Sequence, residues 1–193
     1  EKGQKVDFMV MSATPIPRTL AISLYGDMDV STIKTMPNGR KQVVTDVIKS
    51  HSMKPILNKL KNYLARGGQC YVVCPLVDES ETIDSRDATN IYEGMKSYFK
   101  EHYEVGLLHG KMNDETKEKI MSDFKANQIQ ILVSTTVIEV GVDVKNANWM
   151  VIYNAERFGL SQLHQLRGRV GRGDEQGYCY LLSNSTSKEA IER

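Results

Sequence analysis

Two arginines three residues apart, Arg169 and Arg172, are the side chains of this sequence best suited to chemistry. They lie in the stretch Gln165–Gly173, where a glycine immediately precedes each arginine. On a continuing helix, side chains three residues apart project from the same side. A guanidinium presents a planar fork of donors and keeps its charge, so the pair is suited to binding a phosphate. The alternative is a solvated basic turn, and the rest of the chain has to decide between the two.

The elements that position this stretch alternate between strands and helices. Strands are predicted at 43–49, 69–77, 104–108, 129–135, 149–153 and 178–182. Helices are predicted to begin at Ser52, Ala88, Asn113 and Ser161, and residues 78–89 are predicted to form a polar loop. The last helix carries Leu163, Leu166 and Val170 on one apolar face. Because the strands are continuous apolar runs, the sequence predicts an α/β fold with a parallel sheet covered by helices on both faces.

Polar groups gather where two of these strands end. His109 and Gly110 follow the strand 104–108, and Thr135 and Thr136 follow the apolar run that begins at residue 129. In parallel sheets, ligands bind beside the carboxyl ends of the strands. Hydroxyls and backbone N–H groups there could hold a nucleic-acid backbone. A lone histidine at a strand end is more often structural, and this alternative stays open for His109.

A turn after the strand 129–135 offers two further candidates. Gly141 allows a close approach of backbone to a ligand. Asp143 could accept a hydrogen bond from a ribose hydroxyl or orient Arg169, and it could equally do no more than stabilise a turn.

Several kinds of site are missing from the sequence. The pattern Gly-x4-Gly-Lys-Ser/Thr, which cradles nucleotide phosphates, does not occur, and no strand ends in adjacent carboxylates that could hold Mg²⁺. The chain is therefore not expected to hydrolyse a nucleoside triphosphate unaided. The four histidines lack metal-ligand spacing. Cys70 and Cys74 would be ~13 Å apart on one strand, which indicates buried thiols of a reducing compartment and no metal site.

Bulk properties narrow the choice further. The chain has 193 residues and a formal net charge of +1, so any nucleic-acid binding must come from a local patch. No apolar run reaches the ~20 residues that span a bilayer, so no membrane segment is expected. Residues 27–42 have the composition of a linker between a segment 1–26 and a domain 43–193. The chain opens on Glu1, and both of its ends are expected to be internal to something longer.

Three motifs in this order resemble a known family. Met11–Leu20 resembles motif III of the superfamily 2 helicases, Ser134–Val144 resembles motif V, and Gln165–Arg172 resembles motif VI. Leu107–Met112 resembles the strand-end element that precedes motif V. Tyr25–Ser31 and Cys74–Glu81 are similar to the RecG family of bacterial DNA helicases. The transcription-repair coupling factor family is the second choice. A non-catalytic DNA-binding or docking module on the same fold is the alternative from another class.

The resemblance implies a RecA-like second motor domain at 43–193, with residues 1–26 as the tail of the first motor domain. ATP and Mg²⁺ would lie between the two domains, and the fragment alone would bind neither. Arg169 and Arg172 would act as arginine fingers, with Gln165, Gly141 and Asp143 completing the nucleotide face. The groups that would contact DNA or couple it to the nucleotide are Ser12, Ala13, Thr14, Arg18, His109, Gly110, Thr135 and Thr136.

The resemblance also implies partners and a place in the cell. The partners would be branched double-stranded DNA, such as forks and Holliday junctions, and the first motor domain and a wedge domain in cis. The parent protein would be a monomer in the bacterial cytoplasm, associated with the nucleoid. The phosphate-binding loop, the Mg²⁺-binding carboxylates, the translocation hairpin and the wedge domain all lie outside this chain, so it would hold half of the site.

Overall fold

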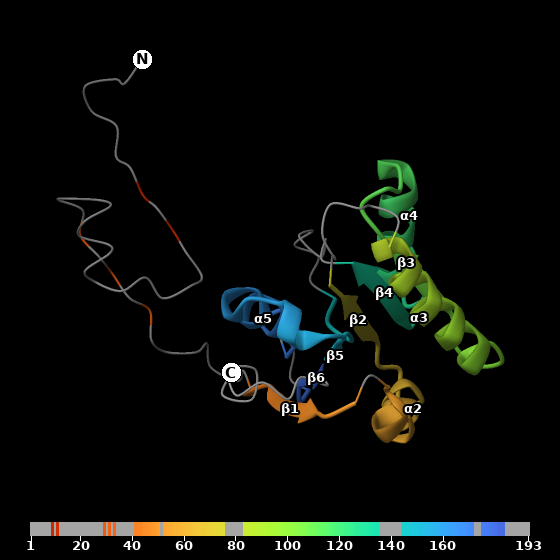
Figure 1. The fold of residues 1–193 in the computed structure, drawn as a ribbon, viewed down its shortest axis with the longest axis horizontal. Helices are drawn as coiled ribbons and strands as arrows, with labels where there is room; N and C mark the ends of the chain where they lie inside the picture. Colours follow the sequence, from red (N-terminus) through yellow and green to blue (C-terminus); the bar gives the residue numbers. More distant parts are fainter. Residues whose placement is uncertain are drawn as a thin grey trace, which may run out of the picture. The chain divides into compact units, whose positions relative to one another are not determined.

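The computed structural model describes residues 41–50, 52–75, 83–135, 144–171 and 175–183, together with positions 9, 11, 29, 31 and 33. The chain divides into two units, Glu1–Pro37 and Asn38–Arg193. Every helix and strand described here belongs to the second unit (Figure 1). The domain limits expected from the sequence, 1–26, 27–42 and 43–193, stay predictions.

Strands and helices alternate along the second unit (Figure 1). The strands are β1 (Val44–Ile48), β2 (Cys70–Cys74), β3 (Val105–Leu108), β4 (Ile131–Thr135), β5 (Trp149–Ile152) and β6 (Tyr178–Leu182). The α-helices are α2 (Leu57–Leu64), α3 (Ile83–Phe99), α4 (Asp114–Lys125) and α5 (Leu160–Arg167), and short 3₁₀ helices span Lys54–Ile56 and Ala155–Arg157.

All six strands form one parallel sheet in the order β1-β6-β5-β2-β4-β3. At its centre Val72 of β2 pairs with Val133 of β4 on one side and with Val151 of β5 on the other. Such β-branched residues pack well on a pleated surface that is buried on both faces. The predicted parallel α/β sheet is confirmed.

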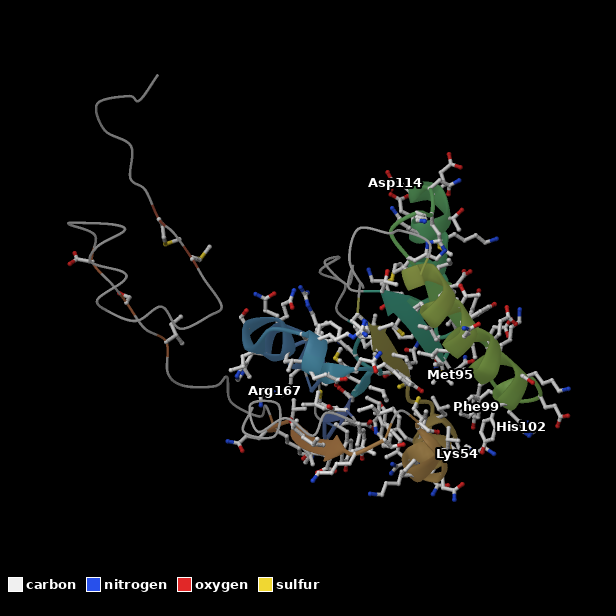
Figure 2. The ribbon with its side chains drawn as sticks, viewed as in Figure 1. Lys54, Met95, Phe99, His102, Asp114 and Arg167 are labelled. Atoms are coloured by element: carbon white, nitrogen blue, oxygen red, sulfur yellow. The ribbon has the colours of Figure 1, made fainter. Side chains whose placement is uncertain are left out.

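Side chains on the two faces of the sheet enter two separate cores. On β2, Cys70, Val72 and Cys74 belong to one core, whereas Tyr71 and Val73 belong to the other, as expected from the two-residue period of a strand. Helices α2 and α3 cover the first face, the latter through buried Met95 and Phe99 (Figure 2). Helices α4 and α5 cover the second face. The domain therefore has three layers, with the sheet in the middle.

Two of the predicted helix starts are wrong. Helix α3 begins at Ile83, so the second half of the predicted loop 78–89 is helical. Its polar first turns hid it from a search for apolar periodicity. The helix predicted from Ser52 begins as a 3₁₀ turn at Lys54 with Met53 as the N-cap, and Ser52 Oγ accepts a hydrogen bond from the Lys54 N–H at 3.2 Å. The predicted helix from Asn113 is confirmed, with Asn113 as its N-cap.

Among the described residues, no helix has the length and apolar character needed to cross a membrane.

Candidate functional site

The arginine-bearing stretch is the end of helix α5 and the turn that follows it. The helix begins one residue before Ser161, and Gly159 is the N-cap, so the predicted cap is wrong. Gln162 Oε1 accepts the N–H of Gly159 at 3.0 Å, and this contact leaves no capping role for the Ser161 hydroxyl. The predicted apolar face is confirmed, because Leu166 and Val170 are buried and Leu163 packs against the same core.

Helix α5 stops before both predicted fingers. Its last residue is Arg167, and a short turn brings Arg169 N–H to the carbonyl of Leu166 at 2.9 Å. Beyond this turn, Gly171 has φ +70°, a left-handed conformation that a right-handed helix does not contain. The helix therefore does not continue to Arg172, and the spacing argument for a shared helix face does not hold. Arg172 itself lies outside the described residues.

Gly171 lies at the amino ends of three strands. Its backbone N–H donates to Oδ1 of Asn148, the residue before β5, at 3.1 Å. A Cβ on Gly171 would lie 2.9 Å from Cγ2 of Val43, the residue before β1. A Cβ on Gly177, the residue before β6, would lie 2.8 Å from Cα of Gly171. A side chain at Gly177 would therefore displace the backbone of Gly171, and the left-handed φ of Gly171 favours glycine there.

Arg169 lies on this turn, two residues from the buried Gly171. It is partly exposed, and among the described residues no carboxylate forms an ion pair with it. The neighbouring arginine behaves differently, because Arg167 Nη2 lies 3.0 Å from Nδ1 of His164 on the same helix. The exposed Gln165 lies one turn earlier on α5. An arginine with a fixed backbone and no acidic partner is suited to an anionic ligand.

The polar groups after β3 and β4 lie at the carboxyl ends of the strands, whereas the arginine-bearing turn lies at the amino ends. His109 follows β3, and Thr135 is the last residue of β4. A five-residue strand at ~3.3 Å per residue puts ~16 Å between the amino ends and the carboxyl ends of the strands. Figure 2 shows Arg167 at the end of α5 far from Asp114 at the start of α4. The predicted candidates thus form two sites on one domain, the arginine turn (residues 167–171) and the strand-end cluster (His109, Gly110, Ser134 and Thr135).

The strand-end cluster contains buried polar atoms that have no partner in the part of the chain that the structure describes. The hydroxyls of Ser134 and Thr135 and the Nδ1 atom of His109 have no hydrogen bond among the described residues. Thr135 is 2% exposed. Burial, and then the positive charges of Lys111 and Lys117, lower the pKa of His109 below its usual 6.5. A buried hydroxyl without a partner costs free energy, so this edge gains stability from any ligand that supplies one.

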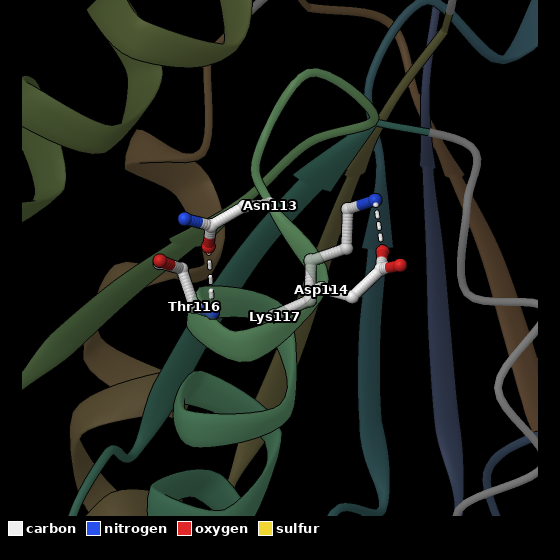
Figure 3. Close-up of polar contacts among 4 residues, drawn as sticks. All are labelled: Asn113, Asp114, Thr116 and Lys117. Carbon is white, nitrogen blue, oxygen red and sulfur yellow. Dashed lines mark hydrogen bonds and ion pairs between the residues drawn. The ribbon is translucent and has the colours of Figure 1, made fainter.

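The start of helix α4 adjoins the strand-end cluster and is firmly held. Asn113 Oδ1 accepts the N–H of Thr116 at 2.9 Å, and Lys117 Nζ lies 3.2 Å from Asp114 Oδ1 (Figure 3). The segment from His109 to Met112 joins β3 to this capped helix, and the N–H of Met112 donates to the carbonyl of His109.

The cysteines are core residues, as predicted. Cys70, Cys74 and Cys179 are buried thiols. Burial raises the pKa of Cys70, and it raises the pKa of Cys179 to about 12. Among the described residues, no group of three or more histidine, cysteine or acidic side chains could hold a metal ion.

Other predicted site residues lie outside the described residues. These are Ser12, Ala13, Thr14, Arg18, Thr136, Gly141, Asp143 and Arg172. Conversely, the contact between Asn148 and the arginine turn was missed by sequence reasoning. A single asparagine before a strand carries no motif that could have indicated it.

The comparisons with known proteins agree with this architecture. A family model described as "Helicase conserved C-terminal domain" matches residues 55–174. The chain belongs to this helicase family. It is 50% identical over 192 residues to the ATP-dependent DNA helicase RecG of Bacillus subtilis (strain 168). It is 52% identical over 193 residues to RecG of Streptococcus pneumoniae serotype 4. The similarity to the RecG family indicated by the motifs is confirmed.

These alignments cover 100% of this chain but only 28% and 29% of the two relatives, so the chain spans less than a third of their length. Among solved structures, Dbp5 of S. cerevisiae bound to RNA and ADP BeF3 matches with a TM-score of 0.60 and 20% identity, over 91% of this chain and 43% of that one. Domain 2 of the DEAD-box helicase Mss116p, bound to an RNA duplex, matches with a TM-score of 0.58 and 19% identity, over 73% and 53%. These structures confirm the RecA-like helicase fold.

Proposed function

We propose that this chain is the second motor domain, with a short part of the first, of an ATP-dependent double-stranded DNA translocase. The full-length protein would remodel stalled replication forks and branch-migrate recombination junctions. The observation that carries the proposal is the pair of separate sites on one helicase domain, with an arginine turn at the amino ends of the strands and a strand-end cluster at the carboxyl ends. Similarity to RecG over the whole chain supports the same reading.

The arginine turn would serve the nucleotide. ATP, when bound between this domain and a preceding one, supplies the phosphoryl group that is transferred to water. Arg169 would stabilise the charge that develops on that group, as arginine fingers do. Gln165, Arg172, Gly141 and Asp143 would complete this face. One feature supports a nucleotide ligand here: Arg169 has no acidic partner among the described residues, so its charge is available to a phosphate. Mg²⁺ would be held by groups outside the chain.

The strand-end cluster would serve the DNA. Thr135, Thr136, His109 and Gly110 would contact the phosphate backbone through hydroxyl, imidazole and N–H groups, which position a duplex without reading its sequence. Ser12, Ala13, Thr14 and Arg18 would couple the nucleotide state to DNA movement. The substrate would be branched double-stranded DNA, and the full-length protein would be a bacterial, nucleoid-associated monomer.

The two sites together suggest how the motor would work. Attraction between the arginines and the bound nucleotide would close the cleft between the two motor domains, and loss of the transferred phosphate would let it open. The DNA contacts belong to the same sheet as the arginine turn and lie ~16 Å away, at the carboxyl ends of its strands. Closure of the cleft would therefore move the arginine turn and the DNA contacts together.

The proposal is tested by ATP hydrolysis measured with and without a forked DNA duplex. We expect the full-length protein to hydrolyse ATP and the fork to stimulate it, whereas the 193-residue chain alone should be inactive. A full-length protein that binds forks but does not hydrolyse ATP would favour a non-catalytic docking module. Binding of RNA polymerase by the full-length protein would favour a transcription-repair coupling factor.

A further inference from the structure

Asn148 is the residue that joins the arginine turn to the sheet. It is 2% exposed and lies immediately before β5. Its side chain accepts the N–H of Gly171 at 3.1 Å through Oδ1 and donates to the carbonyl of Lys145 at 3.0 Å through Nδ2. Both ends of the amide are thus engaged, which fixes the orientation of the side chain.

The backbone of Asn148 is held just as firmly. Its N–H donates to the hydroxyl of Tyr63 on α2 at 3.2 Å, and the same hydroxyl donates to the carbonyl of Asn146 at 2.6 Å. Its carbonyl accepts the N–H of Tyr178 on β6 at 2.8 Å. Asn148 is therefore a fixed point, tied to a helix on one face and to a neighbouring strand.

The arginine turn needs such a point because the helix before it ends at Arg167. Hydrogen bonds to the last turn of α5 hold the N–H groups of Arg169 and Val170. The next residue, Gly171, has a left-handed backbone conformation with φ +70°. Asn148 Oδ1 accepts the N–H of Gly171, two residues after Arg169. Arg169 is therefore held between the end of α5 on one side and Asn148 on the other.

We infer that Asn148 is a positioning residue for ATP hydrolysis, and that its Oδ1 atom sets the place of Arg169. The inference rests on the proposed function, because it requires Arg169 to act on a nucleotide. Asn148 acts through the turn and has no contact with the nucleotide. Its loss should lower kcat for ATP and leave KM nearly unchanged, because a displaced finger weakens an interaction made in the transition state.

The test compares variants of the full-length protein in a fork-stimulated ATPase assay, with kcat expressed per folded protein below all melting transitions. Asn148→Ala removes the acceptor and is expected to lower kcat by about 10- to 100-fold, because small displacements of catalytic groups cost this much. Asn148→Asp keeps an acceptor oxygen for Gly171. Burial favours the protonated carboxyl, whose O–H can donate to the Lys145 carbonyl in place of the amide, so this variant is expected to recover part of the lost kcat.

Gln69→Ala is the matched control. Gln69 is also a fully buried amide, and it precedes β2 as Asn148 precedes the neighbouring β5. Its side chain differs in its contacts, because Nε2 donates to the carbonyls of Phe124 and Ile129, near the end of α4. Its loss should lower the melting temperature but leave kcat within about threefold of wild type.

The outcomes separate this inference from the proposed function. Equal losses of kcat in Asn148→Ala and Gln69→Ala, or a normal kcat in Asn148→Ala, would each overturn the positioning role. If Arg169→Ala in the same assay keeps normal turnover, the proposed function itself fails. Loss of turnover in Arg169→Ala together with normal turnover in Asn148→Ala would leave the proposed function standing and remove only the inference.

Discussion

The buried N–H of the arginine turn, at the amino ends of the strands, has a partner within the protein, whereas the buried hydroxyls at the carboxyl ends lack one among the described residues. At the amino ends of the strands, the arginine turn is packed against Val43 and Gly177, and Asn148 accepts its buried N–H. At the carboxyl ends, the hydroxyls of Ser134 and Thr135 are buried without partners among the described residues. The first edge is held in place by the protein's own contacts, whereas the second has hydrogen-bonding capacity left over. An edge of the second kind gains most from a ligand that supplies the missing partners.

This contrast implies that substitutions at the amino ends of the strands and substitutions at the carboxyl ends should have different effects. A change in the arginine turn should affect the rate of the chemistry, and a change in the strand-end cluster should affect DNA affinity. The predictions below separate the two effects.

The largest expected effect is that of Arg169→Ala on ATP hydrolysis by the full-length protein. Removal of an arginine finger lowers kcat by about 10³- to 10⁵-fold, because the charge on the transferred phosphoryl group loses its counter-charge. The affinity for forked DNA, measured by fluorescence anisotropy, should stay nearly unchanged. Arg66→Ala, which removes an exposed arginine from the turn after α2, is the control and should leave both quantities at wild-type values.

The next effect concerns the packing of the arginine turn. A Cβ at Gly177 would lie 2.8 Å from Cα and 2.9 Å from the backbone nitrogen of Gly171. Gly177→Ala should therefore lower the free energy of unfolding by about 1–3 kcal/mol, as overpacking of a filled site does. Chemical denaturation of the 193-residue chain measures this loss.

Gly94→Ala is the opposite control for that experiment. Gly94 lies within α3, and a Cβ there would have no atom within 4 Å. Alanine in a helix interior should raise the free energy of unfolding by about 0.5–1 kcal/mol. If Gly177→Ala proved as harmless as Gly94→Ala, the arginine turn would not be packed as described.

Thr135→Val tests the other edge with a change of nearly equal shape. The substitution removes a buried hydroxyl that lacks a partner among the described residues, so the free energy of unfolding should rise by about 1 kcal/mol. The affinity for forked DNA should fall by about tenfold, since a hydrogen bond to a charged phosphate is lost. A variant with lower stability would show that the hydroxyl has a partner within the protein, and undiminished DNA affinity would show that it does not contact DNA.

The smallest effect is a pH dependence carried by His109. Its pKa is lowered in the folded protein by burial and by Lys111 and Lys117, so the unfolded chain binds a proton more readily. The stability contributed by neutral His109 is fully present above pH 6.5 and is lost as the pH falls toward the lowered pKa. His109→Gln should reduce the fall in melting temperature between pH 7.5 and 5.5, a range chosen to bracket the usual pKa of ~6.5. An unchanged pH profile would contradict this account of His109.

The sequence predicted the fold well because its signals were local and periodic. Continuous apolar strands such as Tyr71–Val73 indicated burial on both faces, and Asn113 indicated the start of α4 through its capping side chain. Helix α3 was predicted too short because its first turns are polar. Local patterns therefore predicted the elements with an apolar period or a capping residue, and they failed where a helix begins with polar residues.

The site was predicted less completely, for two physical reasons. The sequence offered a shared helix face for Arg169 and Arg172, with a basic turn as the alternative. It did not indicate that α5 would end at Arg167 or that Gly171 would adopt a left-handed conformation. It also gave no sign that Asn148, 23 residues earlier, would meet Gly171. Both features depend on which strand starts lie side by side, and that order is set by the topology of the sheet.

The most direct test of the separation between the two edges is the ATPase rate of the full-length protein measured against the concentration of forked DNA. Arg169→Ala should lower the plateau rate, with the half-saturating DNA concentration remaining near the wild-type value wherever activity can be measured. Thr135→Val should raise the half-saturating DNA concentration and reach the wild-type plateau. A plateau lowered by Thr135→Val with unchanged half-saturation, or a normal plateau in Arg169→Ala, would contradict the assignment of nucleotide and DNA to opposite edges of the sheet.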